Sequence, residues 1–400
     1  MAKQVIFYGA HWCPDCDRVK HWLGEHDIEY KFKNVDDNDE IVEEMLDKTD
    51  GKHLIPTLDV DGEVYQNPSS EKLVELFDVS SEPTENYHDI VMVGAGPSAL
   101  AAAIYTTRED LDTVLIEKGV VGGLAAVTDK VDNYPGFPEG VAGLKLAQDL
   151  RAQAERFGAK IELGEVTEIK DEGQYKRVVT SDGEYLSRVV LVATGSDYKK
   201  LGIPGEEEYY GKGVHYCATC DGAFYRDKRL IVVGGGNSAA QEGMFLTKFA
   251  SHIDVLVRSD QMRASDVLIE KVMSHDKISV HFNTTTDQII GADGKIVKVI
   301  GHDTKKDEDV EFETDGVFVF IGLKPNTGFL KDTDVELDDI GLVKSDRTLE
   351  TAMPGVFASG DVRSGATMQI ASAVGEGATA ALMMREYLEA GEDASPSLYG

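Results

Sequence analysis

Two glycine-rich turns constrain the fold of this chain more than any other feature. One turn, Gly94-Ala95-Gly96-Pro97-Ser98-Ala99, follows the apolar run 90–93, and the other, Gly234-Gly235-Gly236-Asn237-Ser238-Ala239, follows the apolar run 230–233. Both turns lead into helical sequence. A strand, a turn of this kind and a helix begin a Rossmann unit, in which the backbone approaches a pyrophosphate at the helix N-terminus. The sequence therefore predicts an α/β protein with two dinucleotide-binding units.

The second strand of each unit ends in a different kind of side chain. In the first unit, strand 113–116 ends in Glu117, about twenty residues after the turn, where an acid binds ribose hydroxyls. In the second unit, strand 253–257 ends in Arg258, and Arg263 follows. Arginines supply charge-assisted donors to a 2′-phosphate. We therefore expect the second unit to bind NADPH, with NADH as the alternative coenzyme.

The four cysteines of the chain all lie in C-x-x-C pairs, Cys13–Cys16 and Cys217–Cys220. The second pair stands between the two glycine-rich turns, which suggests that electrons pass from one nucleotide cofactor, through another, to sulfur. No signal peptide is visible, so redox or metal sites are favoured over structural bridges. Zinc is the alternative interpretation of the first pair, but no second pair lies near it. We expect no metal site.

Length and charge limit the organisation and the partners. The 400 residues are too many for one core, and two to three domains are expected. The net charge of −32 disfavours nucleic acid, because a polyanion would be repelled. The sequence contains neither a long apolar run nor a basic start followed by an apolar core, so we expect no membrane segment and a cytoplasmic location.

Residues 3–78 have the pattern of a small β-α-β-α-β-β-α unit. This segment resembles a glutaredoxin-like member of the thioredoxin fold, through Trp12-Cys13-Pro14-Asp15-Cys16 and through Ile55-Pro56-Thr57, whose proline the family holds in the cis form. A cysteine at a helix N-terminus is favoured as a thiolate, which suits Cys13 as the nucleophile. Cys16, one turn later, is placed to resolve a mixed disulfide. The family's glycine pair for glutathione is absent, because 66–70 reads Gln-Asn-Pro-Ser-Ser.

Residues 88–390 resemble a low-molecular-weight thioredoxin reductase, whose landmarks all occur in the family's order. They are Gly94-Ala95-Gly96-Pro97, Glu117, Gly122-Gly123, Asn133-Tyr134-Pro135-Gly136-Phe137, Ala193-Thr194-Gly195, Cys217-Ala218-Thr219-Cys220-Asp221, the second glycine-rich turn and Gly360-Asp361. With the N-terminal unit, nearly the whole chain resembles a glutaredoxin–thioredoxin reductase fusion.

The resemblance implies FAD and NADPH as cofactors and assigns roles to individual residues. Gly94, Gly96 and Glu117 would hold the ADP half of FAD, Asn133 would lie near the flavin, and Asp361 would bind the ribityl chain or the pyrophosphate. Further FAD contacts are implied for Pro97, Gly122, Gly123, Ala193, Thr194, Gly195, Gly360, Gln369 and Ile370. The NADPH contacts implied are Gly234, Gly236, Asn237, Ser238, Arg258 and Arg263.

The same resemblance implies the chemistry of the second dithiol. Cys220 would face the flavin, Cys217 would attack the disulfide of the partner, and Asp221 would act as acid and base for the thiols. A carboxylic acid beside a dithiol can protonate a leaving thiolate. A helix cap or a turn is the alternative role for Asp221. For His215, two residues before Cys217, we expect a structural or solvated role.

The predicted architecture is a thioredoxin-fold domain followed by two Rossmann-like domains, with the NAD(P)H domain inserted in the FAD domain. The expected segments are a glutaredoxin-like domain 1–79, a linker 80–87, FAD-domain parts 88–203 and 324–390, an NAD(P)H domain 204–323 and a C-terminal tail 391–400. The seven residues 80–86 of the linker would span at most about 25 Å. It tethers the small domain closely, which favours intramolecular exchange at a high effective concentration.

The predicted function is electron transfer from NADPH through FAD and Cys217–Cys220 to the fused Cys13–Cys16 pair. The expected onward partners are thioredoxin-like proteins, other disulfide substrates or peroxidases, and the expected assembly is a homodimer. Two alternatives stay open: a ferredoxin-fed or peroxidase-linked flavin disulfide reductase, and a flavin redox sensor with little turnover. The first is motivated by Val257-Arg258-Ser259, which stands where the family has His-Arg-Arg.

Overall fold

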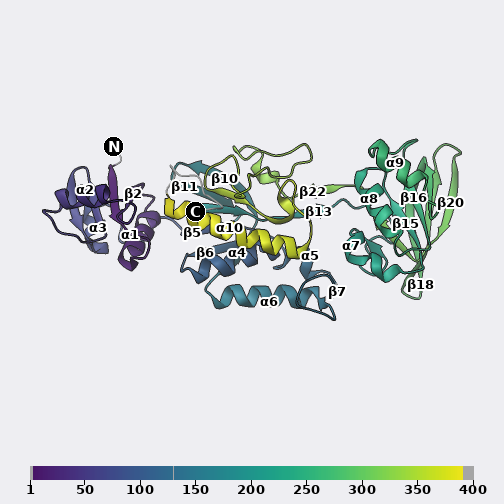
Figure 1. Ribbon diagram of the computed structural model, residues 1–400, viewed down its shortest axis with the longest axis horizontal. Coiled ribbons are helices and arrows are strands. Elements are labelled where there is room, and N and C mark those ends of the chain that lie inside the picture. Colours follow the sequence, from purple (N-terminus) through teal and green to yellow (C-terminus); the bar gives the residue numbers. More distant parts are fainter. Residues whose placement is uncertain (1–2, 129, 391–400) are drawn as a thin grey trace. The chain divides into compact units, whose positions relative to one another are not determined.

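The computed structural model describes residues 3–128 and 130–390 (Figure 1). They divide into two compact units. The first unit contains the chain up to Val127, Leu144–Gly195, and the chain from Pro325 onward, and the second contains Thr128–Gly143 and Ser196–Lys324. Across these described ranges, no helix is long and apolar enough to cross a membrane. The predicted C-terminal tail, 391–400, lies outside the described residues.

The N-terminal module of the first unit has the predicted element order. Its four strands follow the order β2-β1-β3-β4, and only β1 and β2 are parallel. Pro14 begins the first helix, and the side chains of Asn38 and Ser69 cap the other two. The Ile55–Pro56 peptide is cis, as the resemblance implies. The elements are β1 (Val5–Gly9), α1 (Pro14–Glu25), β2 (Lys31–Asn34), α2 (Asp39–Lys48), β3 (Thr57–Val60), β4 (Glu63–Gln66) and α3 (Ser70–Phe77).

The rest of the first unit is built on a seven-stranded sheet. The strand order is β10-β11-β12-β5-β6-β9, and β23 pairs with β12. Helices α4 and α10 pack against each other, as Figure 1 shows. The elements are β5 (Tyr87–Val93), α4 (Pro97–Arg108), β6 (Thr113–Glu117), α5 (Gly123–Ala126), α6 (Gly143–Arg156), β9 (Lys160–Leu163), β10 (Val166–Glu172), β11 (Tyr175–Thr180), β12 (Glu184–Val192), η2 (Gly328–Leu330), β23 (Val356–Ala358), η3 (Gly360–Val362) and α10 (Ile370–Ala390).

The second unit is built on a parallel five-stranded sheet of order β14-β21-β15-β16-β17. A three-stranded antiparallel sheet, β18-β19-β20, accompanies it. The elements are β7 (Lys130–Val131), β8 (Val141–Ala142), β13 (Ser196–Tyr198), β14 (Val214–His215), α7 (Ala218–Asp221), η1 (Gly222–Tyr225), β15 (Arg229–Val233), α8 (Asn237–Leu246), β16 (His252–Val257), α9 (Asp266–Met273), β17 (Ile278–Phe282), β18 (Thr284–Ala292), β19 (Lys295–Asp303), β20 (Glu308–Glu313), β21 (Gly316–Val319) and β22 (Leu323–Pro325).

Two segments differ from their predicted surroundings. Residues 128–143 fall inside the predicted FAD segment, yet they group with the second unit, because β7 and β8 pair with each other and not with the first unit's seven-stranded sheet. The predicted linker ends earlier than expected, since Tyr87 already belongs to β5. The linker backbone is also bound, because Thr84 and Glu85 donate their N–H groups to the Glu25 carbonyl at 2.9 and 3.0 Å.

Candidate functional site

Both C-x-x-C pairs begin a helix. Cys13 is the N-cap residue of α1, Cys217 is the N-cap residue of α7, and both have extended backbones. The Cys13 sulfur accepts the backbone N–H of Cys16 at 3.2 Å, and the Cys217 sulfur accepts that of Cys220 at 3.1 Å. Each pair therefore has its first cysteine at a strand-to-helix turn and its second one helical turn later.

The N-terminal pair lies in apolar surroundings. The two sulfur atoms are 2.7 Å apart, and both cysteines belong to the buried core of the module. Burial, and then the hydrogen bond with Cys13, raise the pKa of Cys16. Trp12 is 70% exposed, and its indole N–H donates to Asp36 at 2.7 Å. Cys16 is thus held as a thiol, as suits a resolving cysteine, and Cys13 is the sulfur nearer to the surface.

The second pair has a polar network beside it. Cys217 and Cys220 form a disulfide with the sulfurs 2.09 Å apart. Asp221 Oδ2 lies 3.2 Å from Nδ1 of His215, and Nε2 of the same ring lies 2.7 Å from the Tyr225 hydroxyl. The imidazole thus stands between two side chains: it lies within ion-pair distance of the Asp221 carboxylate and shares a hydrogen bond with the Tyr225 hydroxyl. Tyr225 therefore holds the imidazole in place beside Asp221.

His215 is buried rather than solvated, because of the sheet in which it lies. It is the last residue of β14, which runs parallel to β21 with Phe318 as its direct partner. The imidazole is 6% exposed and stacks on the Phe318 ring, with centroids 5.1 Å apart. Sequence reasoning missed its contact with Asp221. The only sequence signal is its place two residues before the C-x-x-C pair.

The two glycine-rich turns are built in the same way. Gly94 and Gly234 have positive φ angles of 100° and 143°, and an added Cβ would lie 2.7 and 2.3 Å from the carbonyl oxygen of a neighbouring strand's end. Gly96 and Gly236 are the N-cap residues of α4 and α8 and provide no side-chain cap. A Cβ on either would meet no atom within 4 Å. Backbone N–H groups at both helix starts are thus accessible to a pyrophosphate.

Several predicted FAD segments meet at the first turn. Glu117 accepts the N–H of Ala95 at 2.7 Å, and Gly122 donates its N–H to the Ala95 carbonyl at 2.8 Å. A Cβ on Gly123 would lie 3.6 Å from the Cα of Gly96. The first unit therefore gathers an acid, a second glycine pair and the phosphate-binding turn, as the ADP half of FAD requires.

The Gly360–Asp361 segment closes the same region from the C-terminal part of the chain. Ser359 and Ser98 share a hydrogen bond between their hydroxyls at 2.7 Å, which joins the segment to the start of α4. Burial, and then the charge of Glu376, raise the pKa of Asp361 to about 6. A carboxyl group near its pKa can donate to a hydroxyl as well as accept from it. Asp361 therefore fits the predicted contact with a ribityl chain.

The other predicted FAD residues lie in different surroundings. Thr194 donates its hydroxyl to the Asn326 carbonyl at 2.8 Å, and Gly195 follows with a positive φ of 65°. Gln369 precedes Ile370, the first residue of α10, and donates its side-chain amide to the Met368 carbonyl at 2.8 Å. Asn133 lies in the second unit, between β7 and β8.

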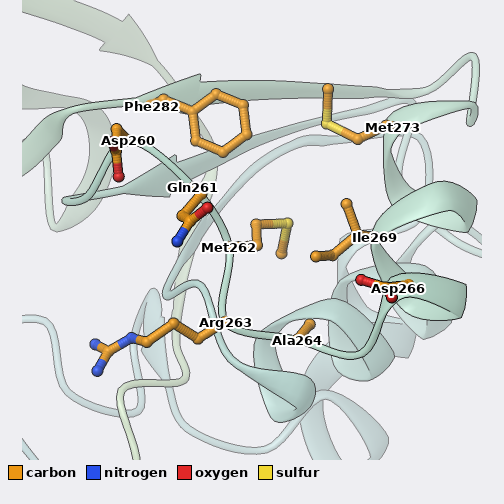
Figure 2. A pocket seen from close by; sticks show the side chains of 9 residues that line it. All are labelled: Asp260, Gln261, Met262, Arg263, Ala264, Asp266, Ile269, Met273 and Phe282. Carbon is orange, nitrogen blue, oxygen red and sulfur yellow. The ribbon is translucent and has the colours of Figure 1, made fainter.

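A cavity of about 570 Å³ lies beside the second glycine-rich turn (Figure 2). Arg263 donates its backbone N–H to the Gly235 carbonyl at 2.6 Å, which ties the cavity's loop to the turn. Figure 2 shows the side chains of Met262 and Ile269 inside the cavity and the guanidinium of Arg263 pointing away from them. Its lining residues are Asp260, Gln261, Met262, Arg263, Ala264, Asp266, Ile269, Met273 and Phe282.

Two exposed arginines mark this end of the second unit. Neither Arg258 nor Arg263 forms an ion pair in the part of the chain that the structure describes, although the whole chain carries a net charge of −32. The apolar side chains of Met262, Ile269 and Phe282 in the lining suit a flat base, and Arg263 supplies donors for a phosphate, while Asp260 and Asp266 line the same cavity. The geometry therefore suits the predicted coenzyme end.

The comparisons with known proteins agree with this arrangement. The family model of pyridine nucleotide-disulphide oxidoreductases matches residues 88–377, and the glutaredoxin model matches residues 5–65. The chain belongs to the pyridine nucleotide-disulphide oxidoreductase family. A thioredoxin reductase of Bacillus subtilis is 40% identical over 305 residues, which are 76% of this chain and 96% of that protein.

Solved structures lead to the same family. The thioredoxin reductase of Streptococcus pyogenes is 38% identical with a TM-score of 0.74, and the match covers 77% of this chain and all of that one. The enzyme of Giardia duodenalis is 30% identical with a TM-score of 0.73, over 76% of this chain and 99% of that one. These matches confirm the predicted fold, a flavin disulfide oxidoreductase of thioredoxin reductase type with an N-terminal glutaredoxin domain. Thioredoxin reductases use FAD and NADPH, and the residues described above fit both.

Proposed function

We propose that the enzyme reduces its own glutaredoxin domain and, through it, disulfides of other proteins. The observation that carries the proposal is the pair of dithiols, each with its first cysteine as the N-cap of a helix. The four cysteines of the chain are all used in these pairs. The onward acceptors proposed are thioredoxin-like proteins, disulfide substrates or peroxidases, and the proposed assembly is a homodimer.

The cofactors supply the electrons for this chemistry. Bound FAD would accept a hydride equivalent from NADPH and make two electrons available to the Cys217–Cys220 disulfide. Gly94, Gly96, Glu117 and Asp361 are proposed to hold FAD. The cavity lined by Arg263 is proposed to hold the adenosine end of NADPH, with Arg258 as a second cation for its phosphate. The later steps are thiol–disulfide exchange between the cysteines and proton transfer to and from their thiols.

The exchange between the two dithiols takes two steps. The Cys217 thiolate attacks the Cys13 sulfur of an oxidised Cys13–Cys16 pair, so that a Cys217–Cys13 bond forms and Cys16 leaves as a thiolate and gains a proton. The Cys220 thiolate then attacks Cys217, the Cys217–Cys220 bond closes and Cys13 leaves. Two electrons pass to the glutaredoxin pair, and one disulfide is exchanged for another.

Asp221 is proposed to move protons to and from the thiols beside it, with His215 as its positioning residue. Asp221 follows Cys220 directly, and its side chain is 22% exposed. His215 Nδ1, 3.2 Å from Asp221 Oδ2, is proposed to hold the carboxylate in one orientation. A carboxylate held in one orientation is already placed for proton transfer to and from a neighbouring thiol.

The test is an anaerobic titration of the fully oxidised, FAD-loaded chain with NADPH, in which free thiols are counted. Four thiols per chain are expected, because electrons reach both pairs. Two thiols would contradict the proposal, since the glutaredoxin pair would then stay oxidised. A chain with Cys13→Ser and Cys16→Ser is the matched control and should yield two thiols.

A further inference from the structure

The glutaredoxin module and the FAD-binding part of the first unit share a specific contact surface. The side-chain amide of Gln174 pairs with the backbone of Tyr30: it accepts the Tyr30 N–H at 2.8 Å and donates to the Tyr30 carbonyl at 2.9 Å. The Tyr175 hydroxyl donates to the Ile28 carbonyl at 2.8 Å. Three directional hydrogen bonds thus fix the loop before β2 against the start of β11.

A close apolar contact lies next to these hydrogen bonds. Tyr87 of β5 and Tyr175 of β11 are 5% and 1% exposed, and their rings meet edge to face at 6.0 Å. From the module, His21 meets the Tyr87 ring at 5.2 Å. Helix α1 comes so near that a Cβ on Gly24 would lie 2.5 Å from that ring. Only glycine allows this approach.

A charge network extends along the same surface. Arg177, whose side chain is 13% exposed, contacts Asp27 of the module at 3.7 Å, Glu85 of the linker at 2.6 Å and Glu172 of its own hairpin at 2.9 Å. Arginine can serve several carboxylates because its five N–H donors lie in a fixed fork. The linker is therefore bound by both neighbours: by Arg177 on one side and by the Glu25 carbonyl on the other.

A buried cation completes the surface. Arg188 of β12 is 5% exposed, lies over the Tyr30 ring at 5.9 Å and donates to the Leu388 carbonyl at 3.5 Å. Attraction between a cation and an aromatic face is strongest where water is excluded. Arg188 thus has the module's ring on one side and the end of α10 on the other.

We propose that this surface holds the glutaredoxin module permanently docked on the FAD-binding part of the chain. Domains joined by a linker move relative to one another by default, unless their interface is large and specific. Here the close packing at Gly24, the paired hydrogen bonds of Tyr30 and the bound linker all oppose such motion. The module is therefore not a carrier that swings on a seven-residue tether.

The docked arrangement changes how the Cys13–Cys16 pair meets its reductant. His11, two residues before Cys13, interacts with the backbone of Glu389 near the end of α10, so the redox loop lies at the margin of the surface. With the module fixed, the approach must be made by the second unit of the chain or by a second copy of the chain. This inference does not depend on the proposed electron route, because docking can be measured without turnover.

The experiment cuts the linker of the otherwise complete enzyme. A protease site replaces Ser81-Glu82-Pro83, which are exposed, and the cleaved protein is passed over a gel-filtration column at micromolar concentration. The two fragments are expected to elute together. Separation of the cleaved wild-type protein would overturn the proposal, because only the peptide link would then have held the module.

Two variants test whether the described surface is the one that holds. Gly24→Ala improves the helix propensity of α1 but places a methyl group against the Tyr87 ring, and Gln174→Ala removes two hydrogen bonds from outside the module. Each should raise the dissociation constant of the cleaved fragments by about tenfold or more. Unchanged affinity in both would overturn the assignment. Gly375→Ala, at a helical glycine where a Cβ meets no atom within 4 Å, is the control that should leave affinity unchanged.

Discussion

The two C-x-x-C pairs have the same local sequence plan and different surroundings. In each, an aspartate follows the second cysteine: Asp17 after Cys16 and Asp221 after Cys220. The side chain of Asp17 is 61% exposed, with the Lys20 ammonium 3.9 Å away, whereas that of Asp221 is 22% exposed and contacts buried His215. Only the second aspartate is thus held by a partner from another element. Tertiary contacts, rather than the motif, distinguish a solvated acid from a positioned one.

The largest expected effect on activity comes from substituting one cysteine in each pair, because the two pairs stand at different positions in the electron route. Cys220→Ala should abolish NADPH-dependent reduction of any disulfide, since no electrons would leave the FAD-binding part of the enzyme. Cys16→Ala should retain reduction of a small aromatic disulfide by Cys217 and lose only the onward route through the glutaredoxin module. Steady-state assays with a small disulfide and a protein disulfide measure both. Unchanged activity of Cys220→Ala would sink the mechanism.

The two aspartates give the next contrast. Asp221→Asn should lower the rate of disulfide reduction by about 100- to 1000-fold, because a general acid–base group contributes in this range. Asp17→Asn is the matched control and should change the rate by less than about threefold, as expected of an exposed acid. Equal losses in the two variants would show that the positioning of Asp221 has no catalytic meaning.

His215 allows the positioning to be tested without changing the acid. His215→Leu should lower the rate about tenfold, since it removes the imidazole that lies 3.2 Å from the Asp221 carboxylate and lets the acid lose its position. His215→Asn, which keeps a donor, should recover part of the loss. In an Asp221→Asn background, His215→Leu should have little further effect. A loss as large in that background as in the wild type would make His215 a purely structural residue.

The smallest expected effect concerns Lys20, the cation near the first pair. Burial raises the pKa of Cys16, and the charge of Lys20 partly opposes this. Lys20→Met removes the opposing charge, so the Cys16 pKa should rise further and its thiolate should form only at higher pH. The rate of glutaredoxin-domain exchange should fall about threefold at neutral pH and recover as the pH is raised. If the pH dependence of the exchange rate is the same in Lys20→Met as in the wild type, Lys20 does not affect the reactivity of Cys16.

Much of the fold could be predicted because its signals are local. The period of apolar residues, the proline at the start of α1 and the glycine turns before α4 and α8 each act within a few residues. The elements they predict, such as the strand at 113–116, occur as β6 (Thr113–Glu117).

The parts that escaped prediction depend on contacts between distant segments. The burial of His215 depends on the pairing of β14 with β21, about a hundred residues away. From the sequence, Gly24 is only a residue of low helix propensity. The structure shows that its missing side chain makes room for the Tyr87 ring. The composition of residues 80–87 predicts only a short linker. Its contacts with Glu25 and Arg177 could not be predicted, because they depend on the surfaces on either side of it.

The most direct measurement of the central claim is to trap the disulfide between the two pairs. A chain with Cys16→Ser and Cys220→Ser retains one sulfur of each pair, and mild oxidation followed by peptide mass spectrometry identifies the linked cysteines. The account predicts a Cys13–Cys217 disulfide as the main product, within one chain or between two. If Cys13 and Cys217 each link only to their own kind or stay free, the two dithiols do not meet and electrons do not pass between them.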